Sequence, residues 1–226
     1  MTTARSGTLY TRHGKRVLDL VVGSALLMLS APVQLAVAAI VRARLGSPVL
    51  LHQRRIGRDG HLFTIVKFRT MLPDRRVARS ITYVGDDRRS GYPSYDDPRH
   101  TRVGTVLRRW SLDELPQLVN VVRGDMSLVG PRPDMASLAG GYEPWQHERH
   151  AVKPGLTGVW QIESRDQGGA LRDFAAVDIA YARSVTLRTD LRVLLRTPFA
   201  LIRRPAPAPG RGDGRQLRVQ GLRARR

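Results

Sequence analysis

The sequence predicts an α/β protein that is mostly helical, with one small β-hairpin, an N-terminal membrane hairpin and amphipathic surface helices. Three observations predict this fold. Residues 17–41 form an apolar run interrupted by Pro32, residues 49–68 hold two β-type segments around a turn, and residues 187–203 repeat leucine and arginine at helical spacing. We divide the chain into a flexible N-terminus (1–11), the membrane hairpin (12–45), the main domain (46–204) and a disordered basic tail (205–226).

The apolar run is long enough to cross a membrane, which takes about 20 residues. Pro32 removes a helical hydrogen bond and should break the helix, and the Ser30 hydroxyl can bond a backbone group that the break leaves unsatisfied. Basic residues flank both ends, at 15–16 and at Arg42 and Arg44, and basic flanks tend to stay cytoplasmic. We therefore favour a re-entrant helix–break–helix that enters and leaves one leaflet, over a spanning helix or a buried core helix.

The other elements follow from residue pattern and turn chemistry. The Asp-Gly turn between residues 49–53 and 62–68 favours a β-hairpin. The last helix sets arginines beside leucines, as in helices that lie on an anionic membrane surface. We also expect loops over residues 73–99, 130–133 and 153–158, and helices over residues 103–109, 111–123 (ending at Gly124), 170–184 and 187–203.

The charge balance narrows the class of partner. Lys and Arg number 38 against 19 Asp and Glu, and this excess of +19 predicts nucleic acid, anionic lipid or phosphorylated substrates as partners. Arginine suits phosphate because its planar fork donates two parallel hydrogen bonds. The chain contains no nucleic-acid-binding signature, so we expect no nucleic-acid partner. It also has no cysteine, which excludes disulfides, thiolate metal sites and cysteine nucleophiles.

An acidic pair, Asp113 and Glu114, stands among arginines in this basic chain. At a helix start the free N–H groups and the helix dipole favour an ionised carboxylate and attract phosphate. Ser111 and Glu114 also match a capping box, and one helix start can serve both roles. Arg132 lies in a stiff Pro-Arg-Pro turn and Lys67 near the end of a strand; either alone is equally consistent with an ordinary surface position.

Taken together and in this order, the motifs strongly resemble the bacterial sugar transferase family, the monotopic polyprenyl-phosphate phosphoglycosyl transferases in their compact form. The resemblance covers about residues 12–197. Its longest match runs from Arg108 to Pro133. The segments that carry it are residues 15–19, 52–57, 63–71, 97–99, 111–118, 124–133 and 153–158, with the pair Asp178 and Tyr181.

The resemblance implies a catalytic domain on the cytoplasmic face of the inner membrane. Asp113 would attack the β-phosphate of a UDP-sugar, release UMP and carry the sugar phosphate to polyprenyl (undecaprenyl) phosphate. Such a reaction begins exopolysaccharide, O-antigen or glycan assembly. The family uses Mg²⁺, with Glu114 and Asp113 as the expected ligands, and Arg108, Arg132 and Lys67 would bind substrate phosphate.

Three alternatives compete with this interpretation. A nucleic-acid-binding protein with an apolar helix would explain the charge but gives the acidic pair no role. An inactive scaffolding protein is disfavoured by the intact Asp113, Glu114 and Arg132. A transferase of the whole glycosyl group would release UDP in place of UMP. One departure from the family pattern is Trp110, which stands where small polar residues are common.

Overall fold

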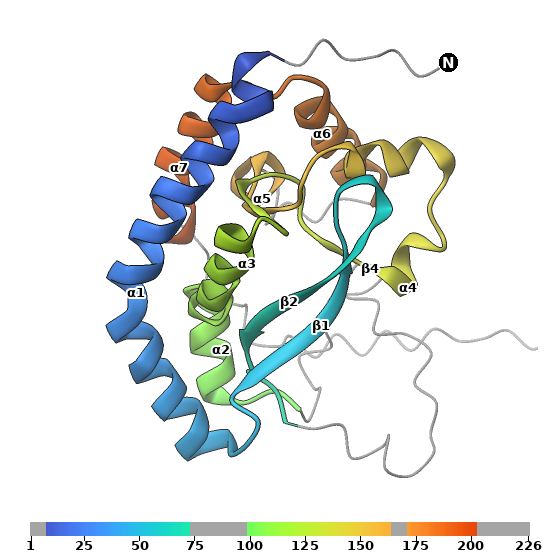
Figure 1. The fold of residues 1–226 in the computed structure, drawn as a ribbon. Coiled ribbons are helices and arrows are strands. Elements are labelled where there is room, and N and C mark those ends of the chain that lie inside the picture. The colour runs from blue at the N-terminus through green and yellow to red at the C-terminus, as the bar shows by residue number, and fades with distance from the viewer. Residues whose placement is uncertain (1–7, 73–98, 164–170, 203–226) are drawn as a thin grey trace, which may run out of the picture.

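The computed structural model describes residues 8–72, 99–163 and 171–202. Helix α1 arches along one side of the molecule, α2 and α3 lie within its concave side, and the β1–β2 hairpin lies beyond them (Figure 1). The α-helices are α1 (Lys15–Leu45), α2 (Arg102–Arg109), α3 (Leu118–Arg123), α4 (Ala136–Ala139), α5 (Val159–Glu163), α6 (Leu171–Arg183) and α7 (Leu187–Ile202). Tighter or wider helical turns are η1 (Tyr10–Gly14), η2 (Arg58–Gly60), η4 (Leu112–Gln117) and η5 (Pro144–Ala151).

The described residues also form two small sheets. The predicted hairpin is confirmed as β1 (Leu50–Ile56) and β2 (Leu62–Phe68), paired antiparallel, and β4 (Asp134–Met135) adds to the free edge of β1. The second sheet was not predicted. It pairs β3 (Ser127–Val129) in parallel with β5 (Gly155–Thr157), and β5 lies inside the predicted loop 153–158.

Helix α1 is a single helix of 31 residues that passes through Pro32. Figure 1 shows it bowed along its length, so the helix bends where a break between two arms was expected. Pro32 has no N–H to donate, and beside it the Ser30 hydroxyl donates to the Leu27 carbonyl at 3.3 Å and accepts from Gln34 at 2.9 Å. One face of α1 packs on the domain through Gly23, Val37 and Val41, but most of the helix surface is exposed. The alternative of a buried core helix is therefore excluded.

The core has two hydrophobic clusters that hold the elements together. The larger one joins α3, β3, α6 and α7 to β2, with Val121, Met126 and Leu128 almost fully buried at its centre. The smaller one joins the end of α1 to β2 and α2 through Val41, Phe68 and Leu107. Because α1 contributes to both clusters, its position is tied to the domain at both ends.

Helices α2, α6 and α7 confirm three of the predicted helices. The predicted helix over residues 111–123 is instead divided into the 3₁₀-helix η4 and the α-helix α3, and Gly124 ends α3 in a left-handed conformation (φ 97°), as expected. The prediction of a capping box formed by Ser111 and Glu114 is wrong. Ser111 is left-handed (φ 53°), whereas N-cap residues are typically extended, and its side chain makes no capping bond. Glu114 forms an ion pair with Arg132. Residues 73–98 of the loop predicted over 73–99, and the basic tail, lie outside the described residues.

Candidate active site

Asp113 lies in the short 3₁₀-helix η4, which packs against β2 between α2 and α3. Its side chain is almost fully buried, with 7% of the residue exposed. The left-handed turn at Ser111 starts η4 directly after α2, so both carboxylates of the acidic pair follow closely on Arg108. A buried carboxylate next to a second carboxylate is costly unless cations surround it.

Burial and the neighbouring Glu114 raise the pKa of Asp113 to about 6, although Lys67, Arg132 and Arg108 act to lower it. The direction differs from the expectation that the helix start simply favours the ionised form. The cause is desolvation, the largest of the contributions, which sequence pattern does not reveal. A pKa near 6 still leaves the carboxylate mostly ionised at neutral pH, while raised pKa values of this kind cluster at functional sites.

The structure brings the five predicted site side chains together from four separate elements. Lys67 comes from β2, Arg108 from α2, the acidic pair from η4, and Arg132 from the loop between β3 and β4. All three cations act on the Asp113 carboxylate. Arg132 also forms an ion pair with Glu114, Nη2 to Oε1 at 2.9 Å, and Arg108 donates to the Thr70 hydroxyl at 3.2 Å.

The Arg132 loop is held by backbone contact with the segment after Lys153. Gly130 donates to the Thr157 carbonyl at 2.9 Å, and Gly155 donates to the Pro131 carbonyl at 2.8 Å. A Cβ added at Gly130 or Gly155 would overlap backbone atoms of the facing segment, so only glycine permits this close approach. The predicted stiffness of the Pro-Arg-Pro turn thus has a tertiary cause in addition to its prolines.

A buried ion cluster lies behind the same loop. Arg149, 1% exposed, pairs with both Asp134 and Asp178 and donates to the Arg132 carbonyl at 3.3 Å. The two aspartates raise the pKa of Arg149 against the effect of burial, which keeps it charged. From the sequence, Asp178 was identified only as a motif residue. Arg149 and Asp134 were not predicted, because no local pattern links positions this far apart.

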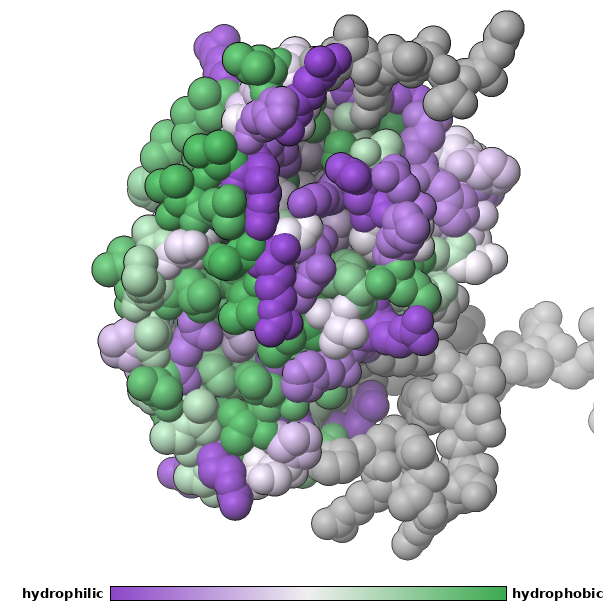
Figure 2. Space-filling view, in the orientation of Figure 1, coloured by the Kyte–Doolittle hydropathy of each residue, from purple (hydrophilic) through white to green (hydrophobic). Residues whose placement is uncertain are grey.

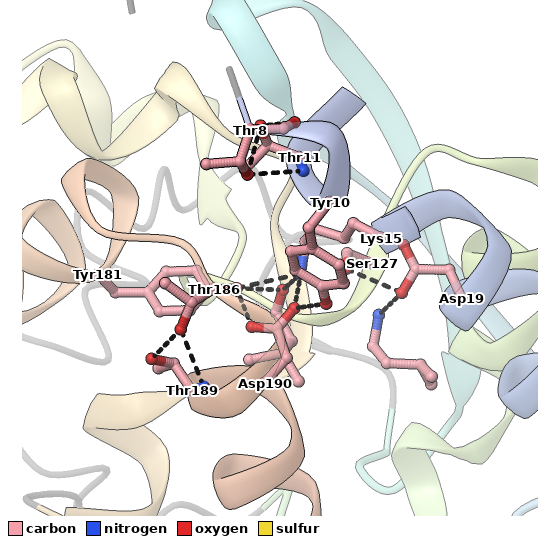
Figure 3. Close-up of polar contacts among 12 residues, drawn as sticks. Thr8, Tyr10, Thr11, Lys15, Asp19, Ser127, Tyr181, Thr186, Thr189 and Asp190 are labelled. Carbon is pink, nitrogen blue, oxygen red and sulfur yellow. Dashed lines mark hydrogen bonds and ion pairs between the residues drawn. The ribbon is translucent and has the colours of Figure 1, made fainter. Parts of the chain in front are cut away.

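A second buried cluster fixes the N-terminal end of α1 (Figure 3). Lys15 pairs with Asp190 of α7 at 2.6 Å and donates to the Val129 carbonyl at 2.9 Å. Tyr181 of α6 donates to the other oxygen of Asp190 at 2.7 Å. One turn along α1, Asp19 accepts from the Ser127 hydroxyl and the Leu128 N–H at 2.9 and 2.8 Å. These contacts join α1 to β3, the strand that leads into the Arg132 loop.

The remaining predicted residues lie elsewhere. Ser30 and Pro32 lie midway along α1 and belong to the membrane prediction, not to the Asp113 cluster. Trp110 is 47% exposed at the end of α2. Within the described ranges, no group of three or more His, Cys, Asp or Glu side chains is arranged to hold a metal ion, so Asp113 and Glu114 are a pair of carboxylates without a third acidic ligand among those residues.

Comparison with known proteins identifies the chain. The family model described as "Bacterial sugar transferase" matches residues 10–204, which include α1, the acidic pair and α7. The chain belongs to the bacterial sugar transferase family. The family and the enzyme class predicted from the motifs, a sugar phosphotransferase, are thereby confirmed.

The relatives of this transferase include short and long proteins. It is 39% identical over 183 residues to the uncharacterized sugar transferase EpsL of Bacillus subtilis, covering 81% of this chain and 84% of that protein. It is 40% identical over 201 residues to the UDP-glucose:undecaprenyl-phosphate glucose-1-phosphate transferase of Caulobacter vibrioides, covering 83% and 69%. It is 34% identical over 200 residues to the undecaprenyl-phosphate galactose phosphotransferase of Salmonella typhimurium, covering 86% of this chain but only 41% of that relative.

Proposed function

We propose that this protein transfers a sugar-1-phosphate from a UDP-sugar to undecaprenyl phosphate through a covalent intermediate on Asp113, as the first step of exopolysaccharide or related glycan assembly. The observation that carries this proposal is the cluster around Asp113. A buried carboxylate of raised pKa faces Lys67, Arg108 and Arg132, and the chain belongs to a sugar transferase family. The names of the Caulobacter and Salmonella relatives support the two substrates.

The first step is a displacement at phosphorus. A carboxylate oxygen of Asp113 forms a bond to the β-phosphorus, and the bond from that phosphorus to the oxygen bridging the two phosphates breaks. UMP leaves with the electron pair, and the sugar phosphate stays on Asp113. Covalent catalysis of this kind divides one difficult displacement into two easier ones.

The second step regenerates the carboxylate. A phosphate oxygen of undecaprenyl phosphate attacks the same phosphorus, and the bond to Asp113 breaks with its electrons returning to the carboxylate. Phosphoryl transfer depends mainly on positioning and on neutralising the charge of the phosphate oxygens. Arg108, Arg132 and Lys67 supply positive charge at Asp113 for that purpose.

Mg²⁺ fits the same acidic pair. Magnesium is commonly bound through one or two carboxylates together with substrate phosphates and water, so Asp113 and Glu114 are sufficient protein ligands once a UDP-sugar is present. When bound, the ion would neutralise phosphate charge. The ion pair with Arg132 at 2.9 Å holds the Glu114 carboxylate in place.

Membrane attachment is the second part of the proposal. Exposed apolar residues line α1, among them Val21, Met28, Leu29 and Leu35 at 65–77% exposure, and Figure 2 shows an apolar strip along this side of the molecule. Helix α1 is long and apolar enough to cross a membrane. An exposed apolar surface of this size marks a membrane or partner contact. We propose that α1 enters the inner membrane from the cytoplasmic side, bends at Ser30 and Pro32, and leaves the membrane again on the cytoplasmic side.

Helix α7 adds to the proposed membrane surface. It begins beside the start of α1, where Asp190 meets Lys15, and then exposes Leu195, Phe199 and Ile202 at 65–72%. Arg188 and Arg192 are exposed on the same helix. Arginines beside exposed apolar side chains suit a surface of anionic lipids.

The chemistry is tested with purified protein, Mg²⁺ and a panel of radiolabelled UDP-sugars. We expect UMP release from at least one sugar and, without lipid acceptor, label bound covalently to protein. Asp113→Asn should abolish both while Asp59→Asn, on an exposed turn, should keep both. Release of UDP would indicate glycosyl transfer, and full activity of Asp113→Asn would refute the assignment of the nucleophile.

The topology is tested with single cysteines, because the chain has none of its own. His13→Cys and Ala43→Cys place thiols at exposed positions near the two ends of α1. A re-entrant helix predicts that a membrane-impermeant maleimide labels both in inside-out vesicles and neither in intact spheroplasts. Labelling of one site in spheroplasts would show a spanning helix.

A further inference from the structure

A basic cavity of about 610 Å³ lies at the N-terminal end of α1. Its walls come from η1 and the first turn of α1, the β1–β2 turn, residues 151–153, and residues 182–186 at the end of α6. Small-molecule sites commonly have volumes of roughly 300–1,000 Å³. None of the five predicted site side chains lines this cavity, so it is separate from the Asp113 cluster.

The cavity carries a large excess of positive charge. Six cationic side chains line it against a single carboxylate, Asp19. Asp19 is buried and turned toward the Ser127 hydroxyl and the Leu128 N–H, as Figure 3 shows. Figure 2 shows hydrophilic residues gathered beside the upper half of α1, next to the apolar strip. The six cations are Arg12, Lys15, Arg16, Arg58, Lys153 and Arg183.

Only some of these cations have protein partners. Three of them form ion pairs: Lys15 with Asp190, Arg58 with Asp59, and Arg183 with Glu148. Arg16 donates to the carbonyls of Val121 and Val122 at the end of α3. In the parts of the chain that the structure describes, no carboxylate lies within ion-pair distance of Arg12 or Lys153.

Lys153 shows that the cations oppose one another. Burial lowers its pKa, and the positive charges of Arg16 and Arg58 lower it further, although the carboxylates of Asp19 and Asp125 partly offset this effect. A half-buried ammonium beside two guanidinium groups is a favourable place for an anion, because an anion would reduce the repulsion among all three. Guanidinium groups and an ammonium are also the donors that proteins use to bind phosphate.

We propose that this cavity binds the phosphate of an anionic phospholipid headgroup. The proposal rests on the membrane attachment proposed above. Val17 and Val21, 58% and 65% exposed, lie on α1 within two turns of Lys15 and Arg16. A phosphate held by Arg12 and Lys153 therefore lies beside the apolar surface along which acyl chains can extend. A soluble phosphate would gain the charge interaction but not this apolar contact.

The test measures lipid binding to the full-length protein in detergent by native mass spectrometry, with no nucleotide-sugar present. The probes are phosphatidylglycerol, which is anionic, and phosphatidylcholine, which has no net charge. We expect the wild type to bind phosphatidylglycerol at least tenfold more tightly than phosphatidylcholine. Arg12→Gln/Lys153→Gln should remove most of this preference. The matched control is Arg42→Gln/Arg44→Gln, which removes the same charge at the other end of α1 and should keep the preference.

Three results would overturn the proposal. The first is no preference in the wild type, and the second is equal loss in both double variants, which would show general attraction between the basic protein and anionic lipid. The third is displacement of phosphatidylglycerol by inorganic phosphate or UMP at comparable concentration, which would show a site for soluble phosphate. Arg12→Gln alone, at an exposed position, should lower the preference severalfold and guards against misfolding of the double variant.

The proposed enzymatic function is tested independently of the lipid site. UMP release is measured with the same protein in a second assay. Absence of any lipid preference in the wild type, with UMP release intact, would reject only the lipid site. Lipid preference without UMP release from any UDP-sugar would reject only the proposed reaction.

Discussion

Lys15 in the first turn of α1 pairs with Asp190 of α7 at 2.6 Å, across 175 residues of sequence. Asp190 is fully buried and also accepts from Tyr10 and Tyr181. The cation therefore sits where the apolar helix joins the catalytic domain, and it compensates a carboxylate that has no access to water.

Removing this cation should destabilise the protein strongly. Lys15→Met leaves the Asp190 carboxylate buried without its positive partner, and loss of one member of a buried pair costs about 3–5 kcal/mol. Chemical denaturation in detergent would measure the change in the free energy of unfolding. Arg42→Met, at an exposed position on the same helix, should change it by less than about 0.5 kcal/mol. Equal stability of Lys15→Met and wild type would contradict the structural role of the pair.

The reaction should depend on ionisation of Asp113. Its pKa is raised to about 6, and only the carboxylate can attack phosphorus. We expect kcat/KM for UMP release to be level above about pH 7 and to fall tenfold per pH unit well below pH 6. The matched measurement is the same profile for Lys67→Gln, which removes a charge that lowers the pKa and should move the midpoint upward. A profile that stays flat down to pH 5 would be inconsistent with Asp113 as nucleophile.

Asp113 should also cost the protein stability. Its pKa in the folded state, about 6, lies above its ordinary value of 3.8. Burial of the ionised carboxylate therefore lowers the free energy of unfolding at pH 7–8. Below pH 4 both states are protonated and the cost disappears. Asp113→Asn should raise the free energy of unfolding by up to about 3 kcal/mol at pH 8, with the gain shrinking as pH falls through 6 toward 4. Thermal melting at pH 8 and pH 4.5 checks this, and Asp59→Asn, at an exposed turn, should melt like wild type at both.

Arg132 should need its guanidinium shape as well as its charge. Arg132→Lys keeps the charge but loses the planar fork that can pair with Glu114 and a phosphate together. We expect kcat/KM for the UDP-sugar to fall about tenfold for Arg132→Lys and by 10²–10³ for Arg132→Gln, as when one preorganised charge-stabilising donor is lost. Steady-state kinetics measures both. Arg109→Lys, exposed on the neighbouring helix, should behave as wild type, and a drop of the same size in that variant would make the effect nonspecific.

The local elements of this fold were readable from sequence. The β1–β2 hairpin and helices α2, α6 and α7 depend on turn residues and periodicity, which a few neighbouring residues define. The candidate site was predicted from motifs, and the structure places Lys67, Arg108 and Arg132 near Asp113. The family supplied the order of these motifs, which no single fragment could have done.

Features that depend on tertiary contacts could not be predicted from the sequence. The capping box does not form: Ser111 is left-handed, and Glu114 forms an ion pair with Arg132, 18 residues away. The pKa of Asp113 moved upward because burial depends on how β2 covers η4. Arg149 and its two aspartates, 15 and 29 residues distant, carry no sequence spacing that marks them as a cluster. The re-entrant path of α1 stays a prediction.

The contact between Gly130 and Gly155 fixes the distance between the Arg132 loop and the facing segment through main-chain atoms alone. The backbones of the two segments are in direct contact at these glycines. Conservative replacements in the surrounding core can therefore change stability but leave the distance from the Arg132 guanidinium to the acidic pair almost unaltered. The two loops cannot move closer, because their backbones are already in contact at Gly130 and Gly155. Changes of sugar preference should therefore be sought by varying side chains that project from these loops, and not by altering the loop backbones.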